Sequence, residues 1–407
     1  MKINLLFLAG LIMLASCDFK QEPLNFKYPE DDFSSDAVLD LRYLNENYAG
    51  EHGFIKLSEN GESFIRSDGQ VIRFWSVNGA DIVRRLSDEE FSTYARYLAK
   101  MGVNMARFHG SINPEGKNTQ INWVDTTEVN NIWRAVAMLK EQGIYTTISP
   151  FWAHNGHMGG WVPEEWGIEG YSGKDALWGV MYFNDTLKEA YKDWVKYLYT
   201  EVNPHTGIAL KDDPAVALIQ IKNEDGVFFW TLQNIKPHLK QLIMQKFTAW
   251  ALDKYGSYEN VREAWNNIRL SEDSDTQFDI YNTWEMTQKK SESEKPRMYD
   301  QVQFLVETQY NFYKEIHDYY KDELGCKQLI NANNWKTADP CLLFDAERYT
   351  YTACEVPAVN RYYSPGHFGE YSGWRIDPGH HYIGESALRD PVQIPVNIRQ
   401  TAGQPML

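Results

Sequence analysis

The chain has 407 residues, with 40 lysines and arginines against 56 aspartates and glutamates, which gives a formal net charge of −16. Such an acidic surface repels phosphate backbones, so nucleic acid is excluded as a partner. Hydrophobic residues make up 43% of the chain and aromatic residues 14%, enough for a sizeable core, which excludes global disorder. The four cysteines are too few for a disulfide scaffold, although Cys341 with Cys354 is one possible pair.

The N-terminus has the layout of a secretory signal. Lys2 supplies a positive start, and an apolar run through Ala15 follows that is too short to span a membrane. The run closes with small residues directly before Cys17, and this segment resembles the lipobox of bacterial lipoproteins, in which the cysteine is lipidated. The resemblance implies a signal peptide over residues 1–16, a lipidated tether over residues 17–50, and attachment to a membrane of the cell envelope (outer membrane or cell surface) through Cys17. An ordinary signal peptide with an incidental cysteine is the alternative.

From residue 53 onward, predicted strands alternate with predicted helices. The apolar segment 54–57 and the turns that follow it predict a small antiparallel hairpin before the main fold. Ser87 and Glu90 form a capping box that opens a helix ending at Gly102. Helical periodicity then predicts helices at residues 129–139, 187–198 and 232–320. Buried strands are predicted at residues 71–78, 103–108, 144–148, 214–221, 328–331 and 353–360.

This alternation of apolar strands and helices predicts an α/β fold with a parallel sheet covered on both faces. A doubly wound nucleotide-binding sheet usually carries a glycine-rich turn after its first strand, and none with that spacing follows Trp75. Polar residues instead crowd the carboxyl ends of the strands, where a barrel collects its active site: Asn78, Asp81, Arg107, His109, His154, Asn223, Glu224, Asn333 and Asn334. The sequence therefore predicts a (β/α)8 TIM barrel over residues 51–407.

The sharpest chemical signal is the pair Asn223-Glu224 at the end of the predicted strand 214–221. Both side chains are expected to project into the mouth of the barrel. A carboxyl group that is partly desolvated there and close to a second carboxylate can hold a proton at neutral pH and donate it to a substrate. The alternative is that Glu224 is an ordinary acidic residue at the start of a loop.

With its neighbouring strands, this motif resembles the retaining glycoside hydrolases of clan A, especially the family-5-like, cellulase-type bacterial enzymes. The matching segments are residues 73–78, 103–109 and 213–224, and the resemblance extends over about residues 50–407. It implies that Glu224 is the general acid/base, that Asn223 hydrogen-bonds the sugar 2-hydroxyl, and that Arg107 orients the nucleophilic carboxylate. Retaining hydrolysis needs two carboxyl groups about 5–5.5 Å apart.

The second carboxylate has several candidates. In the clan the nucleophile ends strand seven, and residues 403–407 look like the opening of that strand. In this interpretation the chain is truncated before strands seven and eight, and the nucleophile lies beyond Leu407. Glu385, which follows a short apolar segment, is the alternative nucleophile, and Glu347 and Glu355 are further candidates.

Aromatic residues near the predicted mouth are candidate sugar platforms, because flat rings bury the apolar faces of pyranoses. The expected substrate-binding residues are His109, Trp152, His154, Trp335 and Tyr362, with Trp161, Trp166 and Trp230 as further rings. For each single ring, core packing is an equal alternative. The histidines form no cluster with cysteines or carboxylates, so neither a metal nor a cofactor is expected.

The sequence thus predicts a glycosidase that acts on a poly- or oligosaccharide outside the cytoplasm, with carbohydrate as its partner. Two alternative functions are compatible with the same barrel fold. One is a non-catalytic glycan-binding lipoprotein that lacks a nucleophile, and the other is an enzyme of different chemistry, such as a lyase that uses tyrosine or histidine.

Overall fold

The computed structural model describes residues 31, 33–34, 37–114, 119–153, 162, 166–173, 176–339, 342–360, 367–368, 381–382 and 402–407. The chain divides into two compact units, Met1–Val38 and Leu39–Leu407. Within the first unit only residues 31, 33–34 and 37–38 are described. The candidate site belongs to the second unit.

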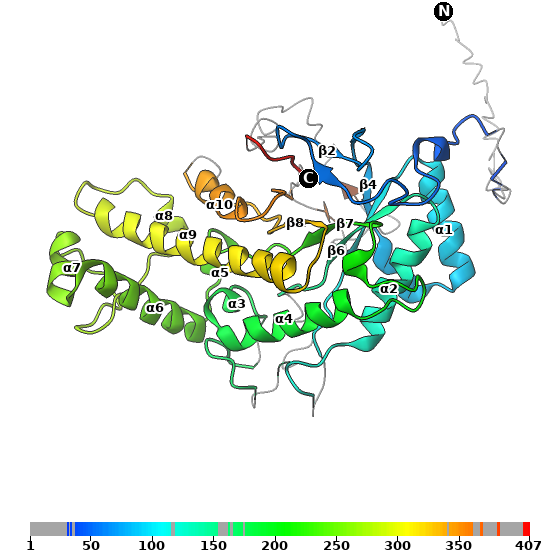
Figure 1. Ribbon diagram of the computed structural model, residues 1–407. Helices are drawn as coiled ribbons and strands as arrows, with labels where there is room; N and C mark the ends of the chain where they lie inside the picture. Colours follow the sequence, from blue (N-terminus) through cyan, green and yellow to red (C-terminus); the bar gives the residue numbers. More distant parts are fainter. Residues whose placement is uncertain are drawn as a thin grey trace, which may run out of the picture. The chain divides into compact units, whose positions relative to one another are not determined.

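A five-stranded parallel sheet forms the centre of the second unit (Figure 1). Its strands lie side by side in chain order: β4 (Ser76–Asn78), β5 (Met105–His109), β6 (Tyr145–Ser149), β7 (Val216–Gln220) and β8 (Leu329–Asn331). A parallel bridge from Asn331 to Val356 adds the chain at a sixth position. A doubly wound sheet reverses its strand order, whereas this sequential order is that of a (β/α)8 barrel. The predicted fold class is confirmed, although the described strands do not close into a ring.

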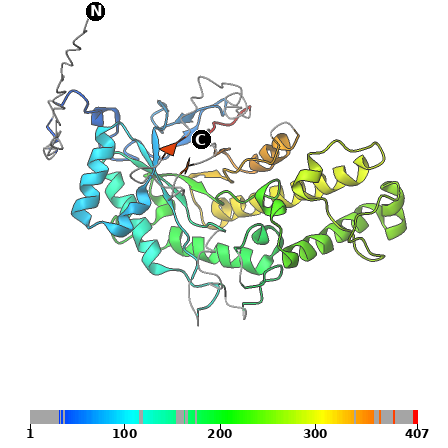
Figure 2. The ribbon, with the colours of Figure 1, turned by 180° about the vertical axis from the view of Figure 1, so that it is seen from behind.

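Three of the helices that follow the first strands begin at polar N-cap side chains, Ser87, Asp125 and Asn184, whereas the short helix after Gly179 has no side-chain cap. In chain order the helices are α1 (Asp88–Lys100), α2 (Thr126–Lys140), α3 (Val180–Phe183) and α4 (Asp185–Thr200), with short turns η1 (Arg42–Leu44), η2 (Ala80–Arg85) and η5 (Leu210–Asp212). The capping box predicted at Ser87 and Glu90 is present. α2 packs against β5 and β6, and α1 packs against α2 (Figure 2). Every residue of β6 and β7 is buried, as expected for central parallel strands.

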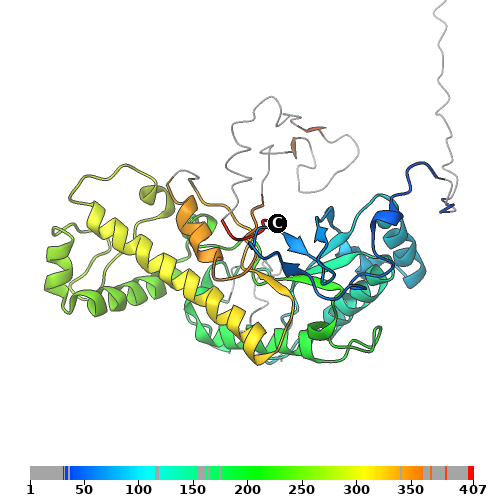
Figure 3. The ribbon, with the colours of Figure 1, turned by 45° about the horizontal axis from the view of Figure 1, so that its top comes forward.

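A helical extension connects β7 to β8. It comprises α5 (Trp230–Gln233), α6 (Pro237–Tyr255), α7 (Tyr258–Ala264), α8 (Thr283–Met286), α9 (Lys295–Asp318) and a π-helical turn, η6 (Tyr319–Glu323). Aromatic stacking ties it together, since the rings of Phe247 and Trp265 lie 5.5 Å apart. After β8, α10 (Phe344–Tyr351) runs beside α9 (Figure 3).

A small antiparallel sheet precedes the parallel one, with β1 (Lys56–Leu57), β2 (Phe64–Ile65) and β3 (Val71–Ile72) in that order. The predicted hairpin is thus present with a third strand. The predicted buried strand 71–78 is wrong in its extent, because its first two residues belong to this sheet and only Ser76–Asn78 joins the parallel one. It is also wrong in its burial, because none of these eight residues is buried. Trp75, between the two strands, is 69% exposed. A further antiparallel pair joins β9 (His367–Phe368) to β10 (His381–Tyr382).

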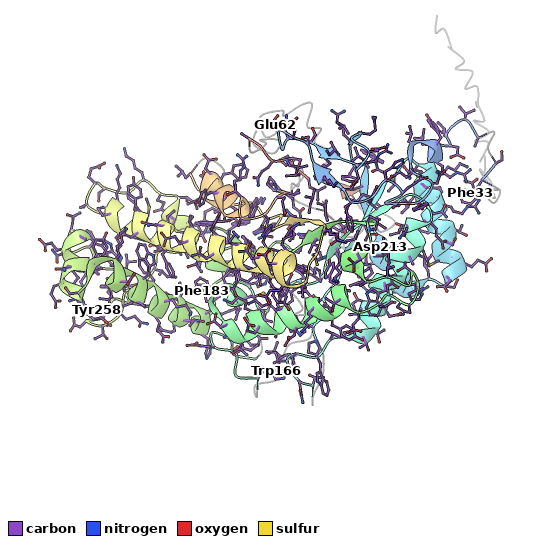
Figure 4. All side chains as sticks on the ribbon, viewed as in Figure 1. Phe33, Glu62, Trp166, Phe183, Asp213 and Tyr258 are labelled. Carbon is purple, nitrogen blue, oxygen red and sulfur yellow. The ribbon has the colours of Figure 1, made fainter. Side chains whose placement is uncertain are left out.

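Several contacts fix the amino-terminal end of the barrel unit. Asp213, labelled in Figure 4, is fully buried just before β7. It pairs with Lys140 at 2.8 Å. Gly50 has a φ of +82° and lies so close to Pro214 that a Cβ atom would approach it to 2.7 Å. The folded unit therefore includes residues 39–50, which the sequence analysis assigned to the tether. The backbone N–H of Leu407 donates to the carbonyl of Pro357 at 3.1 Å, beside the sixth strand position.

Two further observations concern the predicted leader and the thiols. Among the described residues, none of the helices combines the length and the apolar character needed to cross a membrane.

Cys326 and Cys354 are buried free thiols, so the possible disulfide between Cys341 and Cys354 is not formed. Burial raises the pKa of the Cys326 thiol to about 12, which keeps it protonated.

Candidate active site

The carboxyl ends of β5 and β7 bring Arg107 and Asn223 together, as the sequence predicts. Arg107 donates from Nε to Oε1 of Gln220 at 3.0 Å and from Nη2 to Oδ1 of Asn223 at 2.7 Å. Gln220 is the last residue of β7 and is buried. The guanidinium group is therefore fixed across the mouth of the sheet by two amide oxygens. The sequence analysis did not single out Gln220, although its place at the end of a buried strand was a usable signal.

The side chain of Asn223 has a defined orientation. Its Oδ1 accepts hydrogen bonds from Arg107 and, at 3.0 Å, from Nδ2 of Asn334. The residue is 4% exposed. Because the carbonyl oxygen is engaged twice, the amide nitrogen points to the other side, where no described residue accepts a hydrogen bond from it. This N–H group is thus a donor available for a ligand hydroxyl.

Glu224 is held in an unusual backbone conformation. Its φ of +46° lies in the left-handed region, which non-glycine residues rarely adopt. The backbone N–H donates to Oδ1 of Asn334 at 2.9 Å, and Oε1 of the carboxyl group accepts from Nδ2 of Asn360 at 2.7 Å. The side chain is partly exposed. Two asparagines from later strand positions thus fix both the backbone and the carboxyl group of Glu224.

Asn334 and Asn360 are themselves joined, because the backbone N–H of Asn360 donates to the carbonyl of Asn334 at 2.6 Å. The preceding residue, Asn333, donates from Nδ2 to the carbonyl of Asp225 and to the hydroxyl of Tyr313. The sequence analysis noted Asn333 and Asn334 at a strand end but assigned them no role. Asn360 ends the predicted sixth strand, and this position was the only signal that could have found it.

A buried ion pair lies directly behind this asparagine cluster. Lys222 and Asp225, both 0% exposed, flank Asn223 and Glu224 in the chain and pair with each other. Oδ1 of Asp225 also accepts from the backbone N–H of Gly179 and from the hydroxyl of Thr231, each at 2.8 Å. The Lys222 ammonium lies 4.2 Å from the ring centroid of Tyr182. Burial lowers the pKa of Lys222, and the nearby Asp225 charge opposes that shift.

His109, at the end of β5, is a neutral imidazole in this site. Burial, together with the positive charges of Arg107 and Arg84, lowers the pKa of His109 from 6.5 to about 3. Nδ1 lies 3.2 Å from the Ser149 hydroxyl and 3.5 Å from Nη2 of Arg107, which assigns the ring proton to Nε2. No described residue accepts from Nε2. The ring of Trp152 packs 5.0 Å away.

The other predicted substrate-binding residues divide into two groups. Trp335 directly follows Asn334 and packs 5.7 Å from the ring of Phe229, so the structure places it beside the site. His154 and Tyr362 lie outside the described residues, as does the candidate nucleophile Glu385. Their roles remain predictions.

The structure describes the surroundings of Glu347 and Glu355, the two further candidate nucleophiles. Oε1 of Glu347, fully enclosed on α10, accepts from Tyr351 and Gln309, and burial raises the pKa of Glu347 to about 7. Glu355 accepts from the backbone N–H of Ile330 and pairs with His317 and Lys321. Burial opposes ionisation of Glu355, but these partners lower the pKa of its carboxyl group to about 2. Neither residue makes a described contact with Glu224.

The described residues contain no group of three or more histidines, cysteines or carboxylates that could hold a metal ion. The described polar groups around Glu224 are side-chain amides and the guanidinium of Arg107, which supply N–H donors and amide oxygens.

Comparisons with known proteins give distant structural similarities. No protein-family model and no curated protein matches the sequence. An endo-1,4-beta-mannanase from Rhizomucor miehei is 12% identical over 74% of this chain and 99% of its own, with a TM-score of 0.36. A beta-mannanase from the blue mussel Mytilus edulis is 13% identical over 87% of this chain and 82% of its own, with a TM-score of 0.42. An agarase is 10% identical over 78% of this chain and half of its own length, with a TM-score of 0.41.

Proposed function

We propose that this chain is a retaining glycoside hydrolase that cleaves a poly- or oligosaccharide, with Glu224 as its general acid/base. The observation that carries the proposal is the fixed position of Glu224 after β7: Asn334 accepts from its backbone N–H, and Asn360 donates to its carboxyl group. The available N–H group of Asn223 lies next to it in the chain. A left-handed residue held by two side chains is the kind of strain found at functional sites.

The proposed reaction has two steps. Glu224 first donates its proton to the glycosidic oxygen while a second carboxylate attacks the anomeric carbon, and the leaving sugar departs with that proton. Water then attacks the covalent intermediate, Glu224 removes a proton from the water, and the second carboxylate is released. Glu385, or another carboxylate outside the described residues, would supply that second carboxylate. The Asn223 amide would donate to the sugar 2-hydroxyl, and Arg107 would orient the nucleophile.

The proposal is tested by hydrolysis of a panel of soluble glucans, mannans, xylans and galactans by the natural protein. Release of reducing ends supports a glycosidase, and NMR detection of the first-formed anomer reports retention or inversion. Glu224→Gln should lose this activity, and Asp212→Asn is its matched control, because Asp212 is an exposed carboxylate just before the opposite end of β7. Retention of panel glycans without any hydrolysis would instead identify a non-catalytic glycan-binding barrel.

We also propose that the protein works in the cell envelope, anchored by lipid at Cys17. The lipobox-like segment before this residue supports the proposal. In detergent phase partitioning, the natural protein should enter the detergent phase and Cys17→Ser should not, because thioether lipidation needs the thiol. Equal partitioning of both proteins would refute the anchor without affecting the glycosidase proposal.

A further inference from the structure

A cavity of about 340 Å³ opens between residues 170–172 and 176–180 on one side and the helices α5 and α6 on the other. Three aromatic side chains line it, Tyr171, Trp178 and Trp230, together with the polar side chains of Asn234 and His238. Trp230 is 40% exposed. Aromatic faces combined with hydrogen-bonding groups at their edges are the chemistry that recognises a pyranose, whose ring faces are apolar and whose rim carries hydroxyl groups.

The walls of this cavity are tied to the candidate active site through one carboxylate. Oδ1 of Asp225 accepts from the hydroxyl of Thr231, which lines the cavity on α5. The same oxygen accepts from the backbone N–H of Gly179, which lies between the lining residues Trp178 and Val180. Asp225 follows Glu224 directly in the chain. Both walls of the cavity therefore hold a fixed position relative to the proposed acid/base.

An aromatic path leads from the site toward the cavity. Trp335 follows Asn334, which hydrogen-bonds both Asn223 and the backbone of Glu224. The centroid of the Trp335 ring lies 5.7 Å from that of Phe229, and the Phe229 ring lies 6.3 Å from that of Trp230. Trp230 is both the end of this path and part of the cavity wall. The rings of Trp335, Phe229 and Trp230 thus form a series of neighbours that joins the residue after Asn334 to the cavity wall.

Resting on the proposed function, we propose that this cavity is a remote subsite that binds a pyranose residue of the same glycan chain whose scissile bond lies at Glu224. The occupant is a neutral glycan, since the chain carries a net charge of −16, which disfavours polyanionic ligands. Binding energy from a remote sugar holds the scissile bond in place, so the enzyme requires an extended substrate. Trp230 is thus a specificity-determining residue for chain length.

The test compares Trp230→Ala with Trp284→Ala. Trp284 is a matched control, because it is 45% exposed and its ring also lies 6.3 Å from that of Phe229, yet it does not line the cavity. The kcat/KM of each variant is measured on a length series of oligosaccharides prepared from the panel glycan that the natural protein hydrolyses. Affinity electrophoresis in gels containing each panel glycan measures binding separately, with all three proteins also carrying Glu224→Gln.

Trp230→Ala should lower kcat/KM on long oligosaccharides by about tenfold or more, and should leave the shortest cleavable substrate unaffected. Trp284→Ala should have the same kcat/KM as the natural protein on the long oligosaccharides and on the shortest cleavable substrate. Equal losses at every chain length, or equal losses in the two variants, would overturn the subsite. Absence of hydrolysis by the natural protein would reject the proposed function alone, because gel retention that is weakened only by Trp230→Ala would still establish the sugar site. Retention unchanged by Trp230→Ala would reject the subsite.

Discussion

Nδ2 of Asn360 donates a hydrogen bond of 2.7 Å to Oε1 of Glu224, a residue 136 positions earlier in the chain. The two side chains meet because Asn360 follows the sixth strand position while Glu224 follows β7, and both ends open on the same edge of the parallel sheet. This bond fixes the direction of the carboxyl group that we assign as proton donor. Asn360 is therefore a positioning residue for the proposed reaction.

Replacing Asn360 by alanine should lower kcat on a natural glycan by about 10²-fold, because a misplaced acid cannot follow the leaving oxygen. KM should change little, since Asn360 orients the acid and does not itself bind the substrate in this account. Asn360→Asp places a second carboxylate beside Glu224, so the pH profile of kcat should move to higher pH. Identical pH profiles for Asn360→Asp and the natural protein would remove Asn360 from this role.

The left-handed conformation of Glu224 predicts a separation of stability from activity. Glu224→Gly should abolish hydrolysis, yet its free energy of unfolding should stay within about 1 kcal/mol of the natural value. Relief of a left-handed residue, worth about 1–2 kcal/mol, offsets the flexibility that glycine adds to the unfolded chain. Asn267→Gly is the control, because Asn267 also has a positive φ, +59°, away from the site. Urea unfolding gives the free energy of unfolding of both variants. A loss above about 3 kcal/mol for Glu224→Gly alone would contradict the claim that the left-handed conformation of Glu224 is strained.

The buried Lys222–Asp225 pair predicts a non-additive effect. Lys222→Met should destabilise the fold by about 3–5 kcal/mol, since it leaves Asp225 charged and enclosed without its partner. The double variant Lys222→Met/Asp225→Asn should recover part of that loss, because the substituted amide would carry no charge and could still accept from Thr231 and Gly179. Urea unfolding of the two single variants and the double variant gives the coupling. Strict additivity would show that the charges do not interact.

The enclosed carboxyl group of Glu347 predicts a pH-dependent stability. The folded chain holds a proton on Glu347 up to about pH 7, whereas the unfolded chain releases it near pH 4.5. The contribution of this group to the free energy of unfolding is thus greatest below pH 4.5, and it falls by roughly 3 kcal/mol as the pH rises through 7. Glu347→Gln removes that dependence. The difference in stability between variant and natural protein should therefore grow in favour of the variant from pH 5 to pH 8, and a constant difference would contradict it.

Much of the fold could be predicted because apolar strands and capped helices leave local signals. The capping box at Ser87 and Glu90 and the strand before Asn223 were readable from neighbouring residues alone. Parallel strands also bring their carboxyl ends to one edge, so the convergence of Arg107 with Asn223 followed from strand direction. These are the parts of the site that depend on short stretches of chain.

The remaining features depend on distant partners. The left-handed φ of Glu224 needs Asn334, and the burial of Lys222 needs the rings of Tyr182 and Phe312 packed over it. In the sequence, residues 222–225 look like the start of a polar loop. Tyr171 and Trp178 carry no local signal that places them across a cavity from Trp230, because the hydrogen bonds that join their loop and α5 to Asp225 link segments far apart in the sequence.

The central claim is that Glu224 donates and later accepts the proton in a two-step hydrolysis. The most direct measurement is the rate of Glu224→Ala on a dinitrophenyl glycoside of the cleaved sugar, with and without azide. The account predicts that hydrolysis of the natural glycan is lost, that the activated substrate still forms the covalent intermediate, and that azide accelerates its breakdown to a glycosyl azide of retained configuration, because azide attacks without a general base. Unchanged turnover of the natural glycan by Glu224→Ala would contradict the account.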